Sequence, residues 1–168
     1  MIIVLGGVSG VGKTTIGRLL AEDLGWSFYD ADDFHSAENI EKMKNGTPLT
    51  DDDRSAWLVR LRALIEDLLA RNVSAVLACS ALKQEYRDRL RVSDHVRFVI
   101  LSGEFSMIKA RLAEREDHFM PHALLPSQFA LLDEAMPPDV AIDTRDDPIK
   151  LVLEVKRALY IDDEEKRY

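Results

Sequence analysis

The sequence predicts an α/β fold in which a mostly parallel sheet carries helices on both faces. Short apolar runs alternate along the chain with longer amphipathic stretches, which is typical of parallel strands joined by helical crossovers. A glycine-rich segment, residues 7–12, stands between the first apolar run and the first amphipathic stretch. The length of 168 residues suits one domain, and we expect a single domain over residues 1–168.

The hydrophobic pattern and the capping signals predict each element in order. Apolar residues between Ile16 and Leu24 recur at helical spacing, and Gly25 is expected to end that helix. Thr50 is expected to cap a long helix whose first turn is acidic. Strands are predicted at residues 2–6, 28–30, 73–79, 96–101 and 140–143. Helices are predicted at residues 13–24, 37–44, 50–71, 83–91, 105–115 and 147–159, before a charged tail.

Composition and charge exclude several classes of protein. Hydrophobic residues make up 46% and charged residues 31% of the chain, which excludes a wholly disordered protein. No apolar run approaches the ~20 residues of a membrane span. The formal charge of -8 makes general binding of nucleic acid or anionic membrane a poor fit. The single cysteine, Cys79, excludes an intramolecular disulfide, and we expect a buried thiol and a cytoplasmic location.

The segment from Gly7 to Thr14 matches the phosphate-binding pattern G-x-x-x-x-G-K-[ST] in full. Glycines let the backbone wrap an anion, so that N–H groups and the next helix N-terminus face phosphates. In this pattern Lys13 reaches the β- and γ-phosphates, and the Thr14 hydroxyl coordinates magnesium. The predicted nucleotide contacts are Gly7, Val8, Ser9, Gly10, Val11, Gly12, Lys13, Thr14, Thr15 and Arg111. The motif indicates binding of a nucleoside triphosphate, without choosing between a GTPase, an ATPase and a small-molecule kinase.

Two carboxylates follow the second predicted strand, at the sheet edge where ligands of parallel sheets bind. Asp30 and Asp32 are two residues apart, so in an extended chain they point the same way. We expect Asp30 to hold magnesium through water and Asp32 to take the proton from an attacking hydroxyl. The alternative is an acidic cap before the next helix, which fits Asp33 or Ser36 better. His35 is either a substrate donor or a hydrogen-bond partner within the loop.

Further segments have a distinctive composition, including Cys-Ser-Ala-Leu-Lys at residues 79–83 and His-Phe-Met-Pro at residues 118–121. The others are residues 30–35, 39–43, 46–54, 86–88, 111–115 and 124–129. With the phosphate loop, these segments resemble the gluconokinase family of shikimate-kinase-like P-loop kinases, over nearly the whole chain. The chain also lacks an Asn-Lys-x-Asp segment that reads guanine, which favours a small-alcohol kinase over a GTPase.

The resemblance implies a five-stranded parallel sheet of order 2-3-1-4-5, a substrate-binding helical segment at about residues 37–72 and a lid at about residues 115–126. It implies ATP-dependent phosphorylation of D-gluconate at the 6-hydroxyl, with Mg²⁺, giving 6-phospho-D-gluconate for the pentose phosphate route. Members of the family are often homodimers. Ser36 and Ala56 stand where the family usually has proline, and Val11 where it usually has serine. None of these departures removes a group that the chemistry needs.

Gluconate is an anionic polyol, so its site needs a cation for the carboxylate and polar groups for the hydroxyls. We expect Arg54 and Lys83 to be those cations, since a guanidinium fork suits a carboxylate. The alternatives are a surface pairing of Arg54 with Asp51 or Asp52, and a solvated Lys83. Arg87 either faces substrate or is simply helical. The predicted substrate-binding residues are Asp32, His35, Arg54, Ser80, Lys83, Arg87, His118 and Gln128.

Lys13, Asp32 and Arg115 are the predicted catalytic residues. Arg111 and Arg115 lie four apart on the helix that leads into the lid, where arginines stabilise the transferring phosphoryl and exclude water. The alternative is a basic solvated stripe. His118 and His122 lack a third ligand nearby, so a zinc site is not expected. Two rival functions stay open, namely a kinase of the same fold with another small acceptor and a nucleotide-dependent regulatory module.

Overall fold

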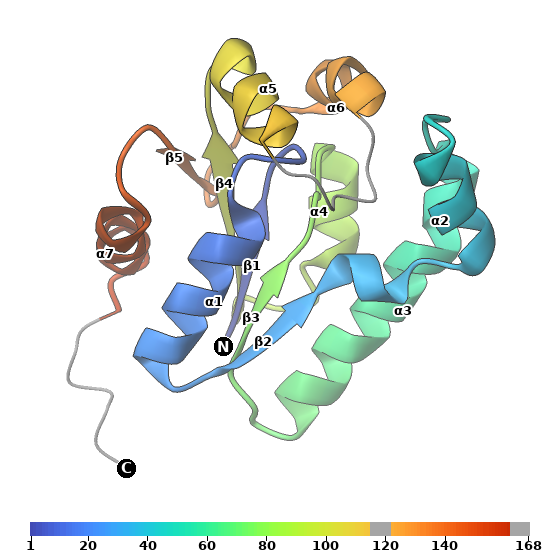
Figure 1. Cartoon of the computed structure of the whole chain (residues 1–168). Coiled ribbons are helices and arrows are strands. Elements are labelled where there is room, and N and C mark those ends of the chain that lie inside the picture. Colours follow the sequence, from blue (N-terminus) through green and yellow to red (C-terminus); the bar gives the residue numbers. More distant parts are fainter. Residues whose placement is uncertain (115–121, 162–168) are drawn as a thin grey trace.

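The computed structural model describes residues 1–114 and 122–161, and its centre is a five-stranded parallel sheet (Figure 1). The strand order is β2-β3-β1-β4-β5 with every neighbouring pair parallel, which confirms the predicted order. The strands are β1 (Ile2–Gly6), β2 (Ser27–Asp30), β3 (Ala75–Ala78), β4 (Val96–Ser102) and β5 (Val140–Asp143). Their carboxyl ends meet at one edge, and this edge carries the site described below.

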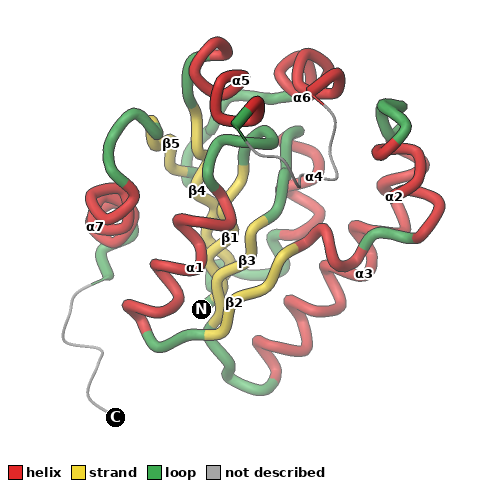
Figure 2. The backbone as a smooth tube through the Cα atoms, in the orientation of Figure 1, coloured by secondary structure: helices red, strands yellow, loops and turns green. Residues whose placement is uncertain are grey.

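Helices cover both faces of this sheet (Figure 2). One face packs against α1 (Lys13–Leu24), α5 (Phe105–Ala113) and α7 (Pro148–Ala158). The other face packs against α3 (Asp51–Ala70) and α4 (Gln84–Leu90). Toward the carboxyl ends of the strands lie α2 (Ala37–Lys44), α6 (Leu125–Leu131) and the short 3-10 turns η1 (Ala31–Phe34) and η2 (His122–Leu124).

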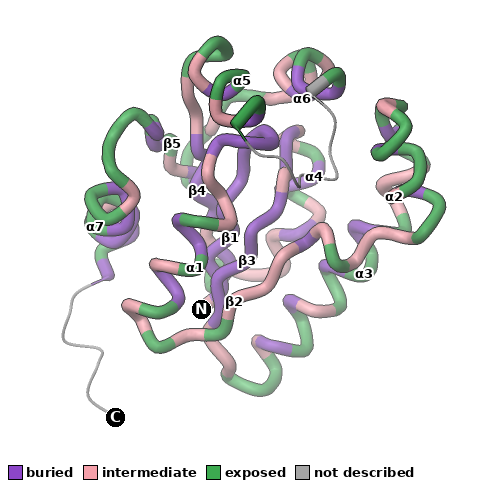
Figure 3. The backbone as a smooth tube through the Cα atoms, in the orientation of Figure 1, coloured by how far each residue is buried: buried purple, intermediate pink, exposed green. Residues whose placement is uncertain are grey.

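Each face of the sheet has its own hydrophobic core. The central strands β1 and β3 are buried along their length (Figure 3). In β1, Ile3 and Leu5 pack into the core beneath α1 and α7, whereas Ile2 and Val4 pack into the core beneath α3. This division follows from the period of two along a strand. Cys79 is buried in the second core, as predicted, and burial raises the pKa of its thiol to about 12.

The capping signals in the sequence lie where they were predicted. Gly25 follows α1 in the left-handed region, with φ 69°. The Thr50 hydroxyl accepts a hydrogen bond from the Asp53 N–H, and the Asp53 carboxylate accepts one from the Thr50 N–H. This capping box starts α3, while the Ser36 hydroxyl starts α2 by accepting a bond from the Asn39 N–H. These caps fix the ends of the two helices that flank the site.

A third and much smaller hydrophobic cluster lies outside the two main cores. It consists of Met43 in α2, Leu49 in the loop before α3, and Leu124 in η2. The cluster joins the predicted substrate-binding segment to the C-terminal part of the predicted lid.

Two features differ from the sequence prediction, and the predicted lid is described only in part. The seven-residue α6 and the turns η1 and η2 were not predicted, because such short elements contain too few apolar repeats to show a period. Strand β3 covers residues 75–78 rather than 73–79. Of the predicted lid, residues 115–121 lie outside the described residues, and the remainder forms η2 and the start of α6. Within residues 1–114 and 122–161, no helix is long and apolar enough to cross a membrane.

Candidate active site

The phosphate-binding pattern forms the turn between β1 and α1. Gly7, Gly10 and Gly12 have φ values of 128°, 79° and 112°, which residues with side chains rarely adopt. A Cβ atom on Gly10 would lie 2.5 Å from Cγ of Leu112 in α5. The backbone of the turn therefore favours glycine at all three positions, and close packing against α5 also requires it at Gly10.

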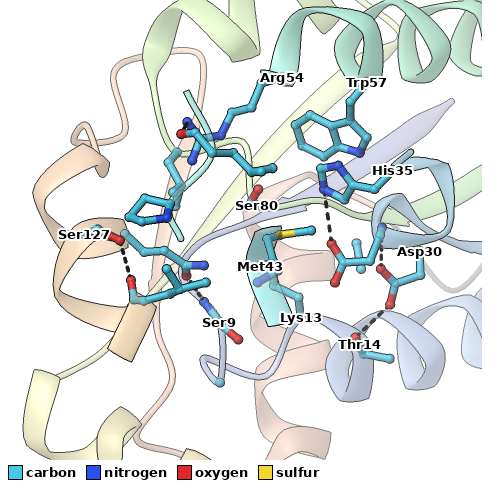
Figure 4. Close-up of a pocket in the computed structure, with 18 of the residues that line it drawn as sticks. Ser9, Lys13, Thr14, Asp30, His35, Met43, Arg54, Trp57, Ser80 and Ser127 are labelled. Atoms are coloured by element: carbon cyan, nitrogen blue, oxygen red, sulfur yellow. Dashed lines mark hydrogen bonds and ion pairs between the residues drawn. The ribbon is translucent and has the colours of Figure 1, made fainter. Parts of the chain in front are cut away.

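Lys13 and Thr14 begin α1 and lie at the carboxyl edge of the sheet. The Lys13 ammonium donates hydrogen bonds to the carbonyl oxygens of Gly7 and Val8, both at 2.9 Å. The Thr14 hydroxyl donates to Oδ2 of Asp30 at 3.1 Å (Figure 4). The cation and the hydroxyl of the motif are thus placed beside the first of the two predicted carboxylates.

Asp30 and Asp32 lie together where β2 ends. Oδ1 of Asp30 accepts a hydrogen bond from the Asp32 N–H at 3.1 Å, so Asp30 also caps η1, whereas Ser36 caps α2. The Asp32 side chain lines a cavity and is 39% exposed. Burial and the neighbouring Asp30 carboxylate raise the pKa of Asp32 to about 6, although the Lys13 ammonium acts to lower it. Asp32 therefore has the proton affinity that a general base needs near neutral pH.

His35 stacks on Trp57, with ring centroids 4.6 Å apart and planes inclined by 7°. Its Nε2 lies 4.0 Å from Oδ1 of Asp32, and its Nδ1 is buried without a hydrogen-bond partner. Burial, together with the cations Arg54 and Arg60, lowers the pKa of His35 to about 4. The imidazole is therefore neutral at pH 7. The structure places His35 at the cavity rather than in a hydrogen bond within its own loop.

These groups converge on one cavity at the carboxyl edge of the sheet. In Figure 4, Asp30, His35 and Trp57 lie on one side, and Ser9 and Ser127 lie on the other. The cavity is lined by Ser9, Gly10, Gly12, Lys13, Thr14, Asp30, Asp32, His35, Met43, Pro48, Leu49, Arg54, Trp57, Ala78, Ser80, Leu82, Leu124, Ser127 and Gln128. Phosphate-binding, carboxylate and cationic groups from distant parts of the chain therefore share one space.

Besides Asp32 and His35, three more of the predicted substrate-binding residues line this cavity, each from a separate element. Arg54, in α3, donates to the Leu49 carbonyl oxygen at 2.6 Å. Ser80 follows β3, and Gln128 lies in α6. Oε1 of Gln128 accepts a hydrogen bond from the Ser9 N–H at 2.6 Å, which brings α6 onto the phosphate loop. The predicted surface pairing of Arg54 with Asp51 or Asp52 does not occur, because this guanidinium faces the cavity.

Lys83 does not line the cavity, contrary to expectation. Its ammonium pairs with the Asp51 carboxylate at 2.8 Å, and that carboxylate also accepts a hydrogen bond from the Tyr86 hydroxyl. The ion pair raises the pKa of Lys83 and lowers that of Asp51. Lys83 thus joins the start of α4 to the start of α3, instead of lying solvated on its helix.

Arg87 is fully buried and also lies outside the cavity lining. Its guanidinium donates to the carbonyl oxygens of Ala81, Leu82 and Glu134 at 3.1, 3.2 and 2.8 Å. Its Nε lies 3.1 Å from Oδ2 of Asp139. The predicted contact of Arg87 with substrate is not supported by this geometry, since the side chain instead ties α4 to the segment before β5.

A second cavity lies on the other side of the phosphate loop, lined by Gly10, Val11, Gly12, Thr15, Ile16, Arg111, Thr144, Asp146, Pro148 and Leu151. Arg111 donates to the Thr144 carbonyl oxygen at 2.7 Å and to the Thr144 hydroxyl at 3.2 Å. Five of the predicted nucleotide contacts therefore line this space, namely Gly10, Val11, Gly12, Thr15 and Arg111. Two predicted residues, Arg115 and His118, lie outside the described residues.

Sequence reasoning missed several residues that line the first cavity. Met43, Pro48, Leu49 and Trp57 fall within the predicted substrate-binding segment but were given no role of their own, Trp57 being assigned to the apolar stripe of its helix, and Ser127 was given no site role. An apolar stripe does not distinguish a residue that packs in the core from one that also presents a face to a cavity. The indole N–H was the available signal, because a buried tryptophan needs a partner for it.

The fold and the site define the class of protein. A shikimate kinase family model matches residues 9–134, which covers most of the chain. A solved shikimate kinase from Aquifex aeolicus shares the fold, with a TM-score of 0.61 at 20% identity over 95% of this chain and 96% of that one. The protein is a P-loop kinase of the shikimate kinase family.

Closer relatives narrow this assignment. A probable gluconokinase from Xenopus tropicalis is 44% identical over 174 residues, covering 93% of this chain and 92% of the relative. The gluconokinase of Gluconobacter oxydans is 46% identical over 132 residues, covering 78% of this chain and 74% of the relative. A gluconokinase structure from Sinorhizobium meliloti matches with a TM-score of 0.83 at 41% identity, over 94% of this chain and 90% of that one. The chain belongs to the gluconokinase family.

Proposed function

We propose that this protein transfers the γ-phosphoryl group of ATP to the 6-hydroxyl of D-gluconate, giving 6-phospho-D-gluconate and ADP. The observation that carries the proposal is the convergence of the phosphate loop, Asp32 and Arg54 on one cavity. Such a reaction needs a site for the phosphoryl donor, a proton acceptor and a cation for the acceptor's carboxylate. The choice of acceptor is supported by the relatives named gluconokinase that align over most of the chain.

The nucleotide is proposed to lie along the phosphate loop, with its base toward the second cavity. The loop N–H groups and the N-terminus of α1 would bind its phosphates. On binding, the Lys13 ammonium would give up its hydrogen bonds to the Gly7 and Val8 carbonyl oxygens and donate to phosphate oxygens instead. Arg111 and Pro148 line the second cavity and offer flat faces against which a base can stack.

The Thr14 hydroxyl and the Asp30 carboxylate fit a magnesium site, and they are proposed to hold Mg²⁺, Asp30 through water. Magnesium prefers oxygen ligands and commonly takes one or two from the protein, with water and phosphate completing its shell. The two side-chain oxygens lie 3.1 Å apart beside the phosphate loop, so both are close to where the phosphates are proposed to bind. When bound, the ion neutralises charge on the phosphates.

Asp32 is proposed as the general base and Arg54 as the cation that binds the gluconate carboxylate. Ser80 and Gln128 line the same cavity and supply hydrogen-bonding groups for the remaining hydroxyls. Lys83 and Arg87 are not among the proposed substrate-binding residues, since their cationic groups pair with the carboxylates of Asp51 and Asp139. Two roles stay predictions from the resemblance. Arg115 is predicted to stabilise the transferring phosphoryl group, and His118 is predicted to contact the substrate.

The test is steady-state ADP production with Mg²⁺ and ATP, with and without D-gluconate. Shikimate, glucose and AMP serve as parallel acceptors, and mass spectrometry identifies the product. We expect ADP release to depend on gluconate and the product to be 6-phosphogluconate. Turnover on another acceptor alone would make the protein a kinase of different specificity, and nucleotide binding without turnover on any acceptor would favour a regulatory module.

The cellular setting is also proposed. The single Cys79 favours the reducing cytoplasm, because no intramolecular disulfide can form. The homodimer implied by the family resemblance stays a prediction, which sedimentation equilibrium checks directly.

A further inference from the structure

The imidazole of His35 is a buried polar group to which the proposed function assigns no role. Its side chain is 5% exposed and lines the first cavity. Within residues 1–114 and 122–161, neither ring nitrogen makes a hydrogen bond, since Nδ1 has no partner there and the Asp32 oxygen nearest to Nε2 is 4.0 Å away. Buried polar side chains nearly always have partners, so an unpaired one at a cavity wall points to a ligand contact.

The position of the imidazole proton follows from its surroundings. Burial, together with the cations Arg54 and Arg60, disfavours a second proton on the ring, so His35 is neutral and carries one N–H group. Nε2 is the nitrogen that faces the Asp32 carboxylate, and a lone pair there would repel the carboxylate oxygens. We therefore assign the proton to Nε2, which makes it a hydrogen-bond donor directed toward Asp32.

The separation of 4.0 Å is too long for a direct hydrogen bond but suits one intervening oxygen atom. An oxygen about 2.8 Å from each atom would subtend an angle of roughly 90°, close to the angle between two bonding directions of a hydroxyl. We propose that the attacking hydroxyl of the acceptor binds here, accepting a hydrogen bond from His35 Nε2 and donating one to Asp32 Oδ1. This assignment rests on the proposed function, in which that hydroxyl is the 6-hydroxyl of gluconate.

In the transfer step, one lone pair of the hydroxyl oxygen forms the bond to the γ-phosphorus. The bond between that phosphorus and the β–γ bridging oxygen breaks, and its electron pair leaves on ADP. The hydroxyl proton passes to Asp32, while the second lone pair keeps its hydrogen bond from His35, which loses no proton. His35 thereby fixes the rotation of the hydroxyl so that the attacking lone pair points at phosphorus.

Trp57 is the positioning residue for this pair of groups. Its indole ring stacks on the imidazole of His35, with centroids 4.6 Å apart, as Figure 4 shows. Its indole N–H donates to the Ala31 carbonyl oxygen at 2.8 Å, in the turn η1 that also carries Asp32. The rigid side chain of Trp57 therefore contacts both groups. It stacks on the imidazole ring of His35, and it hydrogen-bonds to the backbone next to Asp32.

The test compares kcat and both KM values of His35→Leu, His35→Gln and Trp57→Phe with those of the wild-type enzyme. His95→Leu, at an exposed position in the turn before β4, is the matched control. We expect His35→Leu to lower kcat about 100-fold with an unchanged KM for ATP, as for misplacement of a reacting group. Glutamine offers an N–H donor of similar reach, so His35→Gln should recover about tenfold of that loss. Trp57→Phe keeps a stacked ring but loses the indole N–H, and should lower kcat about tenfold.

Equal losses in His35→Leu and His35→Gln would overturn the proposal, because a steric role does not distinguish them. A kcat for His35→Leu within twofold of wild type, or a parallel rise in KM for ATP, would also overturn it. Circular dichroism checks folding, and if the leucine variant does not fold, His35→Gln is compared with the nonpolar His35→Met instead. Absence of gluconate-dependent turnover in the wild type is a distinct result, which would overturn the proposed function itself.

A second measurement removes the hydroxyl instead of the imidazole. 6-Deoxy-D-gluconate lacks the reacting hydroxyl and is used as a competitive inhibitor of each enzyme. We expect it to bind the wild type at least tenfold more weakly than gluconate, because it lacks the hydrogen bonds to both His35 and Asp32. In His35→Leu that ratio should shrink, because only the hydrogen bond to Asp32 is then left to lose. The same ratio in both enzymes would show that His35 makes no contact with the hydroxyl.

Discussion

Replacement of Arg87 by methionine should destabilise the protein strongly without changing its affinity for substrate. Methionine keeps a comparable volume but removes a guanidinium that is 0% exposed. That guanidinium donates to main-chain carbonyls on both sides of α4 and pairs with the buried carboxylate of Asp139. The variant therefore leaves several acceptors and one carboxylate inside the protein without their principal donor.

The magnitude follows from these contacts. Removing one partner of a buried ion pair typically costs about 3–5 kcal/mol, and each carbonyl left unpaired adds up to about 1–3 kcal/mol. Arg91 also contacts Asp139 and remains in the variant, which limits the loss. We expect the free energy of unfolding to fall by about 3–4 kcal/mol, a large part of the ~5–15 kcal/mol of an ordinary domain.

Urea denaturation at pH 7, followed by circular dichroism, measures this loss. Arg71→Met is the matched control, because Arg71 pairs with Asp67 on the exposed surface of α3 and should change stability by less than about 0.5 kcal/mol. The KM for gluconate is measured on folded protein at low temperature. A loss below about 1 kcal/mol, or a selective rise in that KM at unchanged stability, would refute the structural role and restore the predicted substrate contact of Arg87.

Three further predictions concern the cavity. Lys13→Ala should reduce phosphoryl transfer below detection with an unchanged circular dichroism spectrum, and normal turnover would contradict the proposed role of the phosphate loop. Asp32→Asn should lower kcat at least 100-fold, as expected for a lost general base, with little change in the Kd for ATP. The same variant should be more stable at pH 8, because a carboxyl whose pKa rises from 3.8 to about 6 on folding opposes folding when ionised. That shift corresponds to about 3 kcal/mol at full effect, which solvent screening of a 39% exposed side chain reduces to about 1 kcal/mol. This gain in the free energy of unfolding should shrink as the pH falls from 6 to 3.8 and vanish below pH 3.8. A gain that does not depend on pH would exclude the Asp32 carboxylate as its cause. Arg54→Ala should raise the KM for gluconate at least tenfold and leave that for ATP unchanged, as for a lost charged hydrogen bond; isothermal titration with each substrate checks it, and equal losses would exclude a carboxylate contact.

The parts of the fold that depend on local signals could be predicted from the sequence. The phosphate loop needs glycines, lysine and threonine at fixed spacing, so its position between β1 and α1 followed from the residues alone. The start of α3 followed from Thr50 and the acidic turn after it. The strand order could not be predicted from local signals, because periodicity does not say which strands pair. It was predicted from the family resemblance.

The parts of the site that depend on distant contacts could not be predicted in this way. Lys83 stands at the start of α4 and Arg87 lies within that helix, and helical spacing does not say which neighbours a helix face will meet. Arg87 is buried because carbonyls of residues 133 and 134, some 46 positions later, converge on it. Trp57 was recognised as a core residue, but its stacking on His35 depends on the path of η1, which has no signal of its own.

The small cluster of Met43, Leu49 and Leu124 has a consequence for how the two substrates meet the enzyme. In this cluster Met43 and Leu49, which line the acceptor cavity, pack against Leu124 in η2. Four residues after Leu124, the Gln128 side chain accepts a hydrogen bond from the Ser9 N–H of the phosphate loop. Acceptor wall and phosphate loop are therefore joined through one short helical segment. A shift at either end is passed to the other, so the two substrates are expected to bind cooperatively. Thermodynamic linkage makes that cooperativity reciprocal, so an affinity for gluconate has meaning only at a stated concentration of ATP.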